Sequence, residues 1–369
     1  MVGFVPSDEQ KMIQDTAKDF AENELTPKAR DCDENDSIPQ ELLETAWGLG
    51  LVNAIIPESY GGVGMDRSAV TGALVNEELA YGDASLAIAI LAPSLFILPI
   101  MEMGTEDQKK KYLPMFCEEK YKPATLAVME PRITFDLSDL HTLYAFDGEN
   151  YILNGTKCNV PMAGEADLFL VMAASNRGVG DSGVDAFIVE KGTNGLSVGE
   201  REKNMGFKAL STYPVTLTDC VVPRENRLGG DRGINYLRLM NLSRVALSAM
   251  AVGVSRASLD YAVNYAKERF AFGEPIASRQ AIAFMLAEMA IETDATRLLT
   301  WKAAWKADRG EDFTKEACLA KTYAGEQTMK ITDCGVQILG GHGYIREHPI
   351  EMWFRNGRGF AILEGMTMV

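Results

Sequence analysis

The spacing of apolar residues changes twice along the chain, and this feature constrains the fold most strongly. From residue 7 to about 120, and again from 233 to 344, apolar residues recur every three or four positions, as on one face of an α-helix. Between 123 and 226, short apolar runs alternate with turn residues, which is typical of antiparallel strands. The sequence therefore predicts helices, then strands, then helices again.

The length and element pattern also indicate how these regions pack. The chain has 369 residues, which is enough for a large core in several layers. The strands vary in length, as expected for a small barrel, and the later helices are long with short links, which favours an antiparallel bundle. We predict an α+β fold with an N-terminal α-helical domain over residues 1–122, a middle antiparallel β-barrel or sandwich over 123–228, and a C-terminal four-helix bundle over 229–369.

Helix starts are marked by capping boxes, in which the first side chain and one three residues later bond each other's backbone N–H groups. Ser7 with Gln10 and Thr105 with Gln108 have this spacing. Pro39 predicts the start of a further helix. A buried face of a core helix is predicted from the spacing of Ile282, Met285, Leu286, Met289 and Thr293.

Strands and turns are predicted in the middle region. The dipeptides Asp147-Gly148 and Asn154-Gly155 favour turns, because glycine readily adopts the backbone angles that turns require. The predicted strands are Thr125–Val128, Tyr151–Leu153, Leu168–Met172, Ala186–Val189 and Val215–Leu217.

Composition excludes several classes of function. The net charge of −16 argues against nucleic-acid binding, which needs a basic surface, although a local basic pocket suffices for an anionic ligand. No apolar run reaches the ~18 residues that span a bilayer, and acidic residues near the start argue against a secretory signal. None of the six cysteines has disulfide-motif or metal-ligand spacing, so we expect reduced thiols in a cytoplasmic protein without a metal site.

Local motifs are more specific than the order of elements. Residues 268–276 read ERFAFGEPI, residues 280–289 read QAIAFMLAEM, and residues 337–344 read QILGGHGY. Earlier in the chain are IPESYGG at 56–62 and DCVVPREN at 219–226. These motifs, in this order and over nearly the whole chain, resemble the acyl-CoA dehydrogenase family.

The motif Ile362–Gly365 contains Glu364, which resembles the catalytic carboxylate of the family's short- and medium-chain branches. The resemblance implies that Glu364 abstracts the α proton of an acyl-CoA thioester, that the Gly365 backbone N–H binds the thioester oxygen, and that the β hydride passes to N5 of FAD. A desolvated carboxylate is the stronger base for such a proton. Other branches place the base before an arginine, where this chain has Ser243 before Arg244, and serine does not serve as that base. By itself, Glu364 is also compatible with a solvated surface carboxylate.

Further positions that resemble the family's binding residues predict FAD and coenzyme A sites. Arg269 matches an arginine that reaches the flavin diphosphate of a neighbouring subunit, so a homodimer or homotetramer is implied. The alternatives are that Phe272 is core, that Gly340 and Gly341 end a helix, and that Arg244 forms a surface ion pair. The expected cofactor-binding residues are Arg269, Phe272, Gln280, Gln337, Gly340, Gly341, Val128 and Met129, and the expected substrate-binding residues are Arg244, Asn241, Gly365 and Arg132.

The chain departs from the family at several flavin-contacting positions. Met129 stands where the family has a threonine that hydrogen-bonds the flavin, and Asn159 and Pro161 replace a tryptophan and a threonine beside the ring. Met366 replaces the threonine of the family's E-G-T. Losing such hydrogen bonds, at about 0.5–1.5 kcal/mol each, predicts weaker flavin binding. Arg132, in place of a glycine, is either a partner for a substrate carboxylate or a surface or intersubunit charge.

Three functions follow from these observations. The first is a FAD-dependent acyl-CoA dehydrogenase that passes electrons to electron-transfer flavoprotein. The second is a redox-silent relative that binds acyl-CoA, for example as a partner subunit, and the altered flavin positions motivate it. The third keeps Glu364 as a base for proton transfer or elimination on a coenzyme A thioester without flavin. Membership of a fold does not choose among them.

Overall fold

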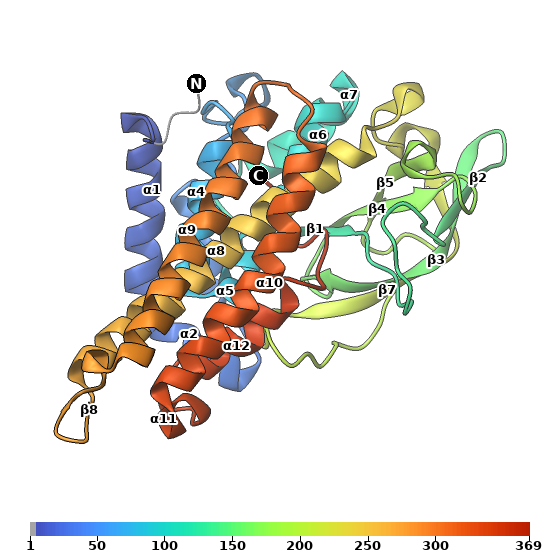
Figure 1. Cartoon of the computed structure of the whole chain (residues 1–369). Helices are drawn as coiled ribbons and strands as arrows, with labels where there is room; N and C mark the ends of the chain where they lie inside the picture. The colour runs from blue at the N-terminus through green and yellow to red at the C-terminus, as the bar shows by residue number, and fades with distance from the viewer. Residues whose placement is uncertain (1–4) are drawn as a thin grey trace.

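The computed structural model describes residues 5–369, and residues 1–4, which begin the predicted N-terminal domain, lie outside the described residues. Figure 1 shows the helices gathered on one side of the molecule and the long strands on the other. The N-terminal helices pack beside those of the C-terminal region, with the sheet next to both. The expected α+β order of helices, strands and helices is therefore confirmed.

The N-terminal helices begin where the sequence predicts. Both capping boxes form, at Ser7 and Gln10 before α1 and at Thr105 and Gln108 before α7, and Pro39 precedes α3. The helices of this region are α1 (Asp8–Phe20), α2 (Thr26–Asn35), α3 (Gln40–Gly48), α4 (Ala69–Gly82), α5 (Ala84–Leu91), α6 (Ser94–Met103) and α7 (Glu106–Tyr112).

Seven strands of the middle region form one curled sheet. The path of paired strands is β1-β4-β2-β3-β7-β6, with β5 paired to the other side of β4, and among the described residues the two ends of this path do not pair. All five predicted strands exist, and the sequence missed the short β2 and β6. The strands are β1 (Ala124–Ala127), β2 (Leu143–Phe146), β3 (Asn150–Pro161), β4 (Leu168–Ala174), β5 (Val184–Glu190), β6 (Leu196–Val198) and β7 (Thr212–Pro223).

The expectation of a wholly antiparallel sheet is wrong for β1. Four strand pairs are antiparallel, but β1 runs parallel to β4, with Ala124 opposite Leu168, and β2 meets β4 in one parallel pair. Parallel neighbours need a long connection, which β2 and β3 supply here. Period-two spacing places a residue on a face but does not fix strand direction, so the sequence pattern left this pairing undetermined.

One of the two predicted turns is instead part of a strand. Asp147-Gly148 forms the expected β2–β3 turn, in which the Asp147 carboxylate accepts the N–H groups of Glu149 and Asn150. Gly155 lies inside β3, at a shift in the pairing with β7. A Cβ there would lie 2.6 Å from Thr142, so glycine allows a bulge that brings two backbone segments together.

The C-terminal region is a bundle built around one buried helix. α8 packs against α4, α9 and α10, and α12 packs on α10. α8 is long and apolar enough to cross a membrane, but 83% of its most apolar stretch is buried by other elements, as in the core helix of a globular protein. The helices are α8 (Tyr236–Glu268), α9 (Gln280–Asp308), α10 (Thr314–Leu339), α11 (Gly341–Tyr344) and α12 (Ile350–Gly359).

The first turns of α9 extend beyond the bundle, so part of the predicted buried face is exposed to solvent in a single chain. Met289 and Thr293 are buried, whereas Ile282, Met285 and Leu286 are only half-buried. A short hairpin of β8 (Phe270–Ala271) and β9 (Glu274–Pro275) connects α8 to α9 and was not predicted. We call residues 269–280 the tip. In Figure 1 it lies at the far end of the bundle from β1.

Candidate active site

Glu364 lies in the loop that follows α12, where the chain turns back between the bundle and the sheet. Its side chain is 18% exposed, so the carboxylate is largely withdrawn from water. The loop is anchored on both sides, because Leu363 and Met366 are buried. The Glu364 backbone N–H donates to the sulfur of Met129 at 3.4 Å, which ties the loop to the segment after β1. The solvated-carboxylate interpretation is therefore wrong for this residue.

Two cations from different helices flank the Glu364 carboxylate. Lys321 Nζ, from α10, lies 3.3 Å from Oε1, and Arg244 Nε, from α8, lies 3.8 Å from Oε2. Oε2 is buried and has no hydrogen-bond partner in the part of the chain that the structure describes. A buried carboxylate is costly unless it is paired, and these cations compensate that cost. One oxygen is nevertheless left unbonded.

The predicted substrate residues on α8 stand next to this carboxylate. Arg244 donates to Asn241 Oδ1 at 3.1 Å and to the sulfur of Cys318 at 3.3 Å. Asn241 is buried and donates in turn to Thr314 at 3.0 Å. Arg244, Asn241 and Glu364 are thus brought together as expected. The Arg244 partners are internal, so the alternative of an exposed surface ion pair does not describe it.

Gly365 is the residue whose backbone approaches the sheet most closely here. Its φ is +68°, in the left-handed region that favours glycine. A Cβ at this position would lie 3.0 Å from Cγ2 of Val128. Val128 and Met129 are both buried beneath the Glu364 loop. Any side chain at 365 would therefore push the loop away from β1.

A cavity of about 200 Å³ adjoins the Glu364 loop. Leu363 and Met366, on either side of Glu364 and Gly365, line one wall, and Asn159 and Thr212 belong to the sheet side. Two of the lining residues, Asn159 and Met366, are at positions that the family resemblance implies near the flavin, whereas the Glu364 side chain does not line this cavity. Apolar walls with a few amide, hydroxyl and guanidinium groups suit a planar heterocycle with polar edges. The residues present therefore fit a flavin ring, with fewer side-chain hydrogen bonds than the family pattern implies.

The other predicted cofactor residues do not join this site within one chain. Arg269 and Gln280 lie in the exposed tip, and Phe272 is 93% exposed. Gln337, Gly340 and Gly341 are exposed where α10 meets α11. Tyr265, near the end of α8, hydrogen-bonds His342 Nδ1 at 2.9 Å, so these two exposed groups share one end of the bundle. The core interpretation of Phe272 is wrong, whereas Gly340 does end α10.

Arg132 is committed to its own loop. Its Nη1 lies 2.7 Å from His141 Nε2 and 3.5 Å from an Asp139 carboxylate oxygen, and its Nη2 donates to the Asp139 backbone oxygen. Its Nε lies 3.4 Å from Glu130. Protein groups thus balance the charge of Arg132 within the chain, and its contact with substrate stays a prediction.

Sequence reasoning missed two buried lysines. Lys157 is fully buried, and its Nζ bonds Glu130 Oε1 at 3.0 Å and the Val128 carbonyl oxygen at 3.1 Å. Burial lowers the pKa of Lys157 to about 8, with Glu130 acting in the opposite direction. Lys321 is 9% exposed beside Glu364. The signal for Lys321 was its place on the face of α10 that carries Ala317, Ala320 and Ala324, which are all buried.

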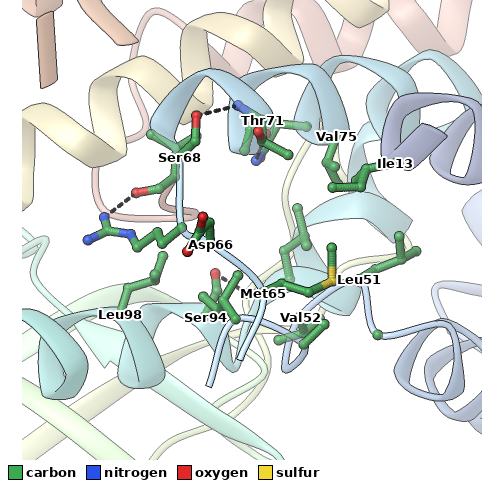
Figure 2. A pocket seen from close by; sticks show the side chains of 18 of the residues that line it. Ile13, Leu51, Val52, Met65, Asp66, Ser68, Thr71, Val75, Ser94 and Leu98 are labelled. Atoms are coloured by element: carbon green, nitrogen blue, oxygen red, sulfur yellow. Dashed lines mark hydrogen bonds between the residues drawn. The ribbon is translucent and has the colours of Figure 1, made fainter. Parts of the chain in front are cut away.

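A second cavity, of about 280 Å³, lies among the N-terminal helices. Figure 2 shows its mostly apolar wall, with Ile13, Leu51 and Val75 facing the same space. Met368 and Val369 line it, but Glu364, Arg244 and Lys321 do not. It shares no lining residue with the cavity that adjoins the Glu364 loop, and no sequence pattern indicated it.

A largely buried carboxylate lies between two cations, near a cavity that suits a heterocyclic cofactor, and this arrangement is compatible with proton abstraction. Three family models match the chain: "Acyl-CoA dehydrogenase, N-terminal domain" at residues 7–120, "Acyl-CoA dehydrogenase, middle domain" at 125–220 and "Acyl-CoA dehydrogenase, C-terminal domain" at 231–369. The chain belongs to the acyl-CoA dehydrogenase family, so the suspected resemblance is confirmed.

Similar proteins agree with this assignment. Short-chain specific acyl-CoA dehydrogenase of Rattus norvegicus is 36% identical over 97% of this chain and 87% of its own length. Subunit CarC of the caffeyl-CoA reductase-Etf complex of Acetobacterium woodii is 38% identical over 98% of this chain and 96% of its own. The structure of butyryl-CoA dehydrogenase from Megasphaera elsdenii superposes with a TM-score of 0.89, at 36% identity, over 98% of this chain and 96% of that one.

The family assignment decides among the three functions that the sequence suggested. Its members are flavin-dependent oxidoreductases that act on acyl-CoA thioesters, and the similar proteins do not favour the redox-silent or flavin-independent alternatives. The implied cofactor is FAD, and a related solved structure is described as an FAD complex. The substitutions at flavin-contacting positions therefore occur in a member of a flavin-dependent oxidoreductase family.

Proposed function

We propose that this protein oxidises an acyl-CoA thioester to the 2-enoyl-CoA, with Glu364 as the base. The observation that carries the proposal is the Glu364 carboxylate, which is largely buried and paired through Oε1, while Oε2 has no hydrogen bond from any residue in the described range 5–369. A base held away from water takes a weakly acidic proton more readily than a solvated one. Oε2 receives the α proton of the thioester.

The Gly365 backbone N–H stabilises the negative charge that develops on the thioester oxygen. Its left-handed conformation and its close approach to Val128 hold this N–H in a fixed position before the reaction. A donor that is already oriented stabilises an oxyanion without further reorganisation. Arg244 and Asn241 contribute the polar end of the site, where coenzyme A enters beside α8.

The bound FAD would supply the acceptor for the β hydrogen, which leaves the thioester as hydride. Leu363 and Met366 supply apolar walls for its ring, and Asn159 takes the place of the tryptophan that the family resemblance implies. Apolar walls there limit the access of water to the ring. Met129 contributes least to flavin binding, because its side chain has no hydroxyl group that could donate a hydrogen bond.

The functional unit contains at least two copies of the chain. Large apolar side chains are exposed around the tip, where Phe270 is 64% and Phe272 93% exposed, and on α11 Tyr344 is 86% exposed. Such a patch marks an interaction surface. A second copy that covers this patch brings its own Arg269 and Gln337 to the diphosphate of the cofactor. A homodimer or homotetramer follows.

Electrons leave through a protein acceptor. The related subunit from Acetobacterium woodii is named as part of a complex with Etf, which supports electron-transfer flavoprotein as the partner. All six cysteines are free thiols, which supports a reducing, cytoplasmic location.

The test is a visible spectrum of the purified protein during titration with a panel of acyl-CoAs. Flavin absorbance that bleaches with at least one of them supports the proposal. Glu364→Gln keeps the shape of the side chain and removes the base, so bleaching slows by about 10²- to 10⁴-fold while flavin stays bound. A Glu364→Gln protein that bleaches at the rate of the unmodified protein contradicts it.

A further inference from the structure

Lys321 is the nearest charged group to Glu364, and nothing in the proposed reaction uses it yet. It projects from α10 into the site, and its side chain is 9% exposed. In the part of the chain that the structure describes, its Nζ makes one hydrogen bond, to Glu364 Oε1 at 3.3 Å. A buried lysine costs free energy unless it is paired. The pairing of Lys321 with one oxygen of Glu364 therefore indicates a function in this site.

The two oxygens of Glu364 have different surroundings. Oε1 is bonded to Lys321, whereas Oε2 is buried with no hydrogen-bond partner among the described residues. Arg244 Nε stands 3.8 Å from Oε2, beyond hydrogen-bond distance, and another nitrogen of Arg244 is held by Asn241 and Cys318. Arg244 therefore supplies charge near Oε2 without occupying it.

We propose that Lys321 is a positioning residue, which binds Oε1 so that Oε2 alone faces the α proton. This inference rests on the proposed function of Glu364. A fixed donor at Oε1 stops the carboxylate from rotating, and small misplacements of a base reduce rates strongly. The positive charge of Lys321 also offsets the cost of burying the Glu364 carboxylate.

Other groups around Glu364 act on its charge as well. Tyr236 on α8 is buried, which raises its pKa, and the charge of Glu364 adds to that rise. The pKa of Glu130, in the segment after β1, is set by burial, which raises it, and by Lys157 and two backbone N–H groups, which lower it, with a net decrease. The charged or titratable groups that face the site are Arg244 and Tyr236 from α8, Lys321 and Cys318 from α10, and Glu130 and Asp136 from the segment after β1.

The experiment compares Lys321→Met with the unmodified protein at one fixed pH. Two quantities are measured: the rate of flavin bleaching by an acyl-CoA that bleaches the unmodified protein, and the incorporation of solvent deuterium at the α carbon of recovered thioester. The second reports proton abstraction by Glu364 without electron transfer. Lys330→Met is the matched control, because Lys330 is an exposed lysine on the same helix.

Without the Lys321 donor, Oε1 of Glu364 is no longer fixed, and the carboxylate can rotate away from the α carbon. Both rates are therefore expected to fall by about tenfold in Lys321→Met. Lys321→Arg keeps a cationic donor and is expected to keep both rates within about twofold of those of the unmodified protein. The apparent KM for the thioester is expected to change less than the rate.

Rates that coincide in Lys321→Met, Lys330→Met and the unmodified protein overturn the role of Lys321. Equal losses in Lys321→Met and Lys321→Arg also overturn it, because they show a packing effect rather than the loss of a cationic donor. If Lys321→Met does not fold, Lys321→Gln takes its place, and the same two rates are compared. An unmodified protein that neither bleaches nor exchanges deuterium removes the proposed function itself, which is a different outcome from unchanged rates in the variants.

Discussion

The Glu364 site and the tip differ in how much of each a single chain completes. Around Glu364, side chains from α8, α10 and the segment after β1 meet and are largely buried. At the tip, Arg269, Phe272 and Gln280 are exposed and have few neighbours. The proposed base is thus surrounded by groups of one chain, whereas in the proposed function a second copy helps to bind the cofactor diphosphate.

This difference separates two kinds of substitution. Changes near Glu364 affect groups that are buried and paired, so they alter folding or the chemical step in each chain independently. Changes at the tip leave the fold of one chain nearly intact, because surface substitutions usually shift stability by less than about 0.5 kcal/mol. Their effect falls on cofactor affinity and assembly. The following predictions test that separation, starting with the largest expected effect.

Lys157→Met tests the buried groups beneath the Glu364 loop. Lys157 pairs with Glu130 under Val128, and removing one partner of a buried pair leaves an uncompensated charge. We expect a loss of about 3 kcal/mol in the free energy of unfolding, the low end for such pairs, because Arg132 and two backbone N–H groups still face Glu130. Denaturant unfolding measures it, with the exposed Lys203→Met as control. Equal losses in both variants contradict the prediction.

The buried pair of Lys157 and Glu130 also predicts that the free energy of unfolding depends on pH. The pKa of Lys157 is about 8 in the folded protein and 10.5 in the reference state. Between these values the unfolded chain binds more protons at this site, so stability rises with pH across that window. Lys157→Met is expected to lack this rise. A difference in unfolding free energy that stays constant from pH 8 to 10.5 contradicts the lowered pKa.

Arg269→Gln tests the exposed tip. Removing a charged hydrogen-bond donor to phosphate costs about 1.5–3 kcal/mol, so FAD affinity is expected to fall by roughly 10- to 100-fold with little change in the stability of the flavin-free chain. Titration of flavin-free protein with FAD measures this loss. Arg279→Gln is the control, since Arg279 lies in the same tip and pairs with Glu274 instead. Equal loss of affinity in both variants means that charge at the tip acts without specific contact.

Met129→Thr restores a hydroxyl on the buried side of the cofactor site. One hydrogen bond contributes about 0.5–1.5 kcal/mol, so FAD is expected to bind about two- to tenfold more tightly. Met172→Thr, at a fully buried position in β4, is the control for replacing a buried methionine. Affinity that falls equally in both variants excludes a flavin contact at position 129.

Much of the fold was predictable because helix and strand periods, capping boxes and turn residues are local signals. Ser7 and Thr105 show this, since each cap formed as expected. Strand direction is not local, so the parallel β1–β4 pair was missed. Gly155 follows an asparagine, as in many turns, but it forms a bulge inside β3. It packs against Thr142, and no sequence pattern indicates that contact.

The site was predictable only where the family resemblance supplied it. Glu364, Gly365, Arg244 and Asn241 meet as expected, because their roles depend on a backbone arrangement that the motifs preserve. Lys321 was quoted in no role, since sequence alone does not show which helix face meets a distant loop. The partners of Arg132 were likewise invisible, as His141 and Asp139 are set by the path of their loop.

Mixed oligomers of Glu364→Gln and Arg269→Gln chains test the central claim most directly. Each variant alone is expected to be nearly inactive at limiting FAD. In a mixed dimer, one site carries both defects and the other carries neither, so random mixing is expected to restore about one quarter of full activity. Activity that stays at the level of the separate variants, in mixtures shown to exchange subunits, contradicts a site shared between two chains.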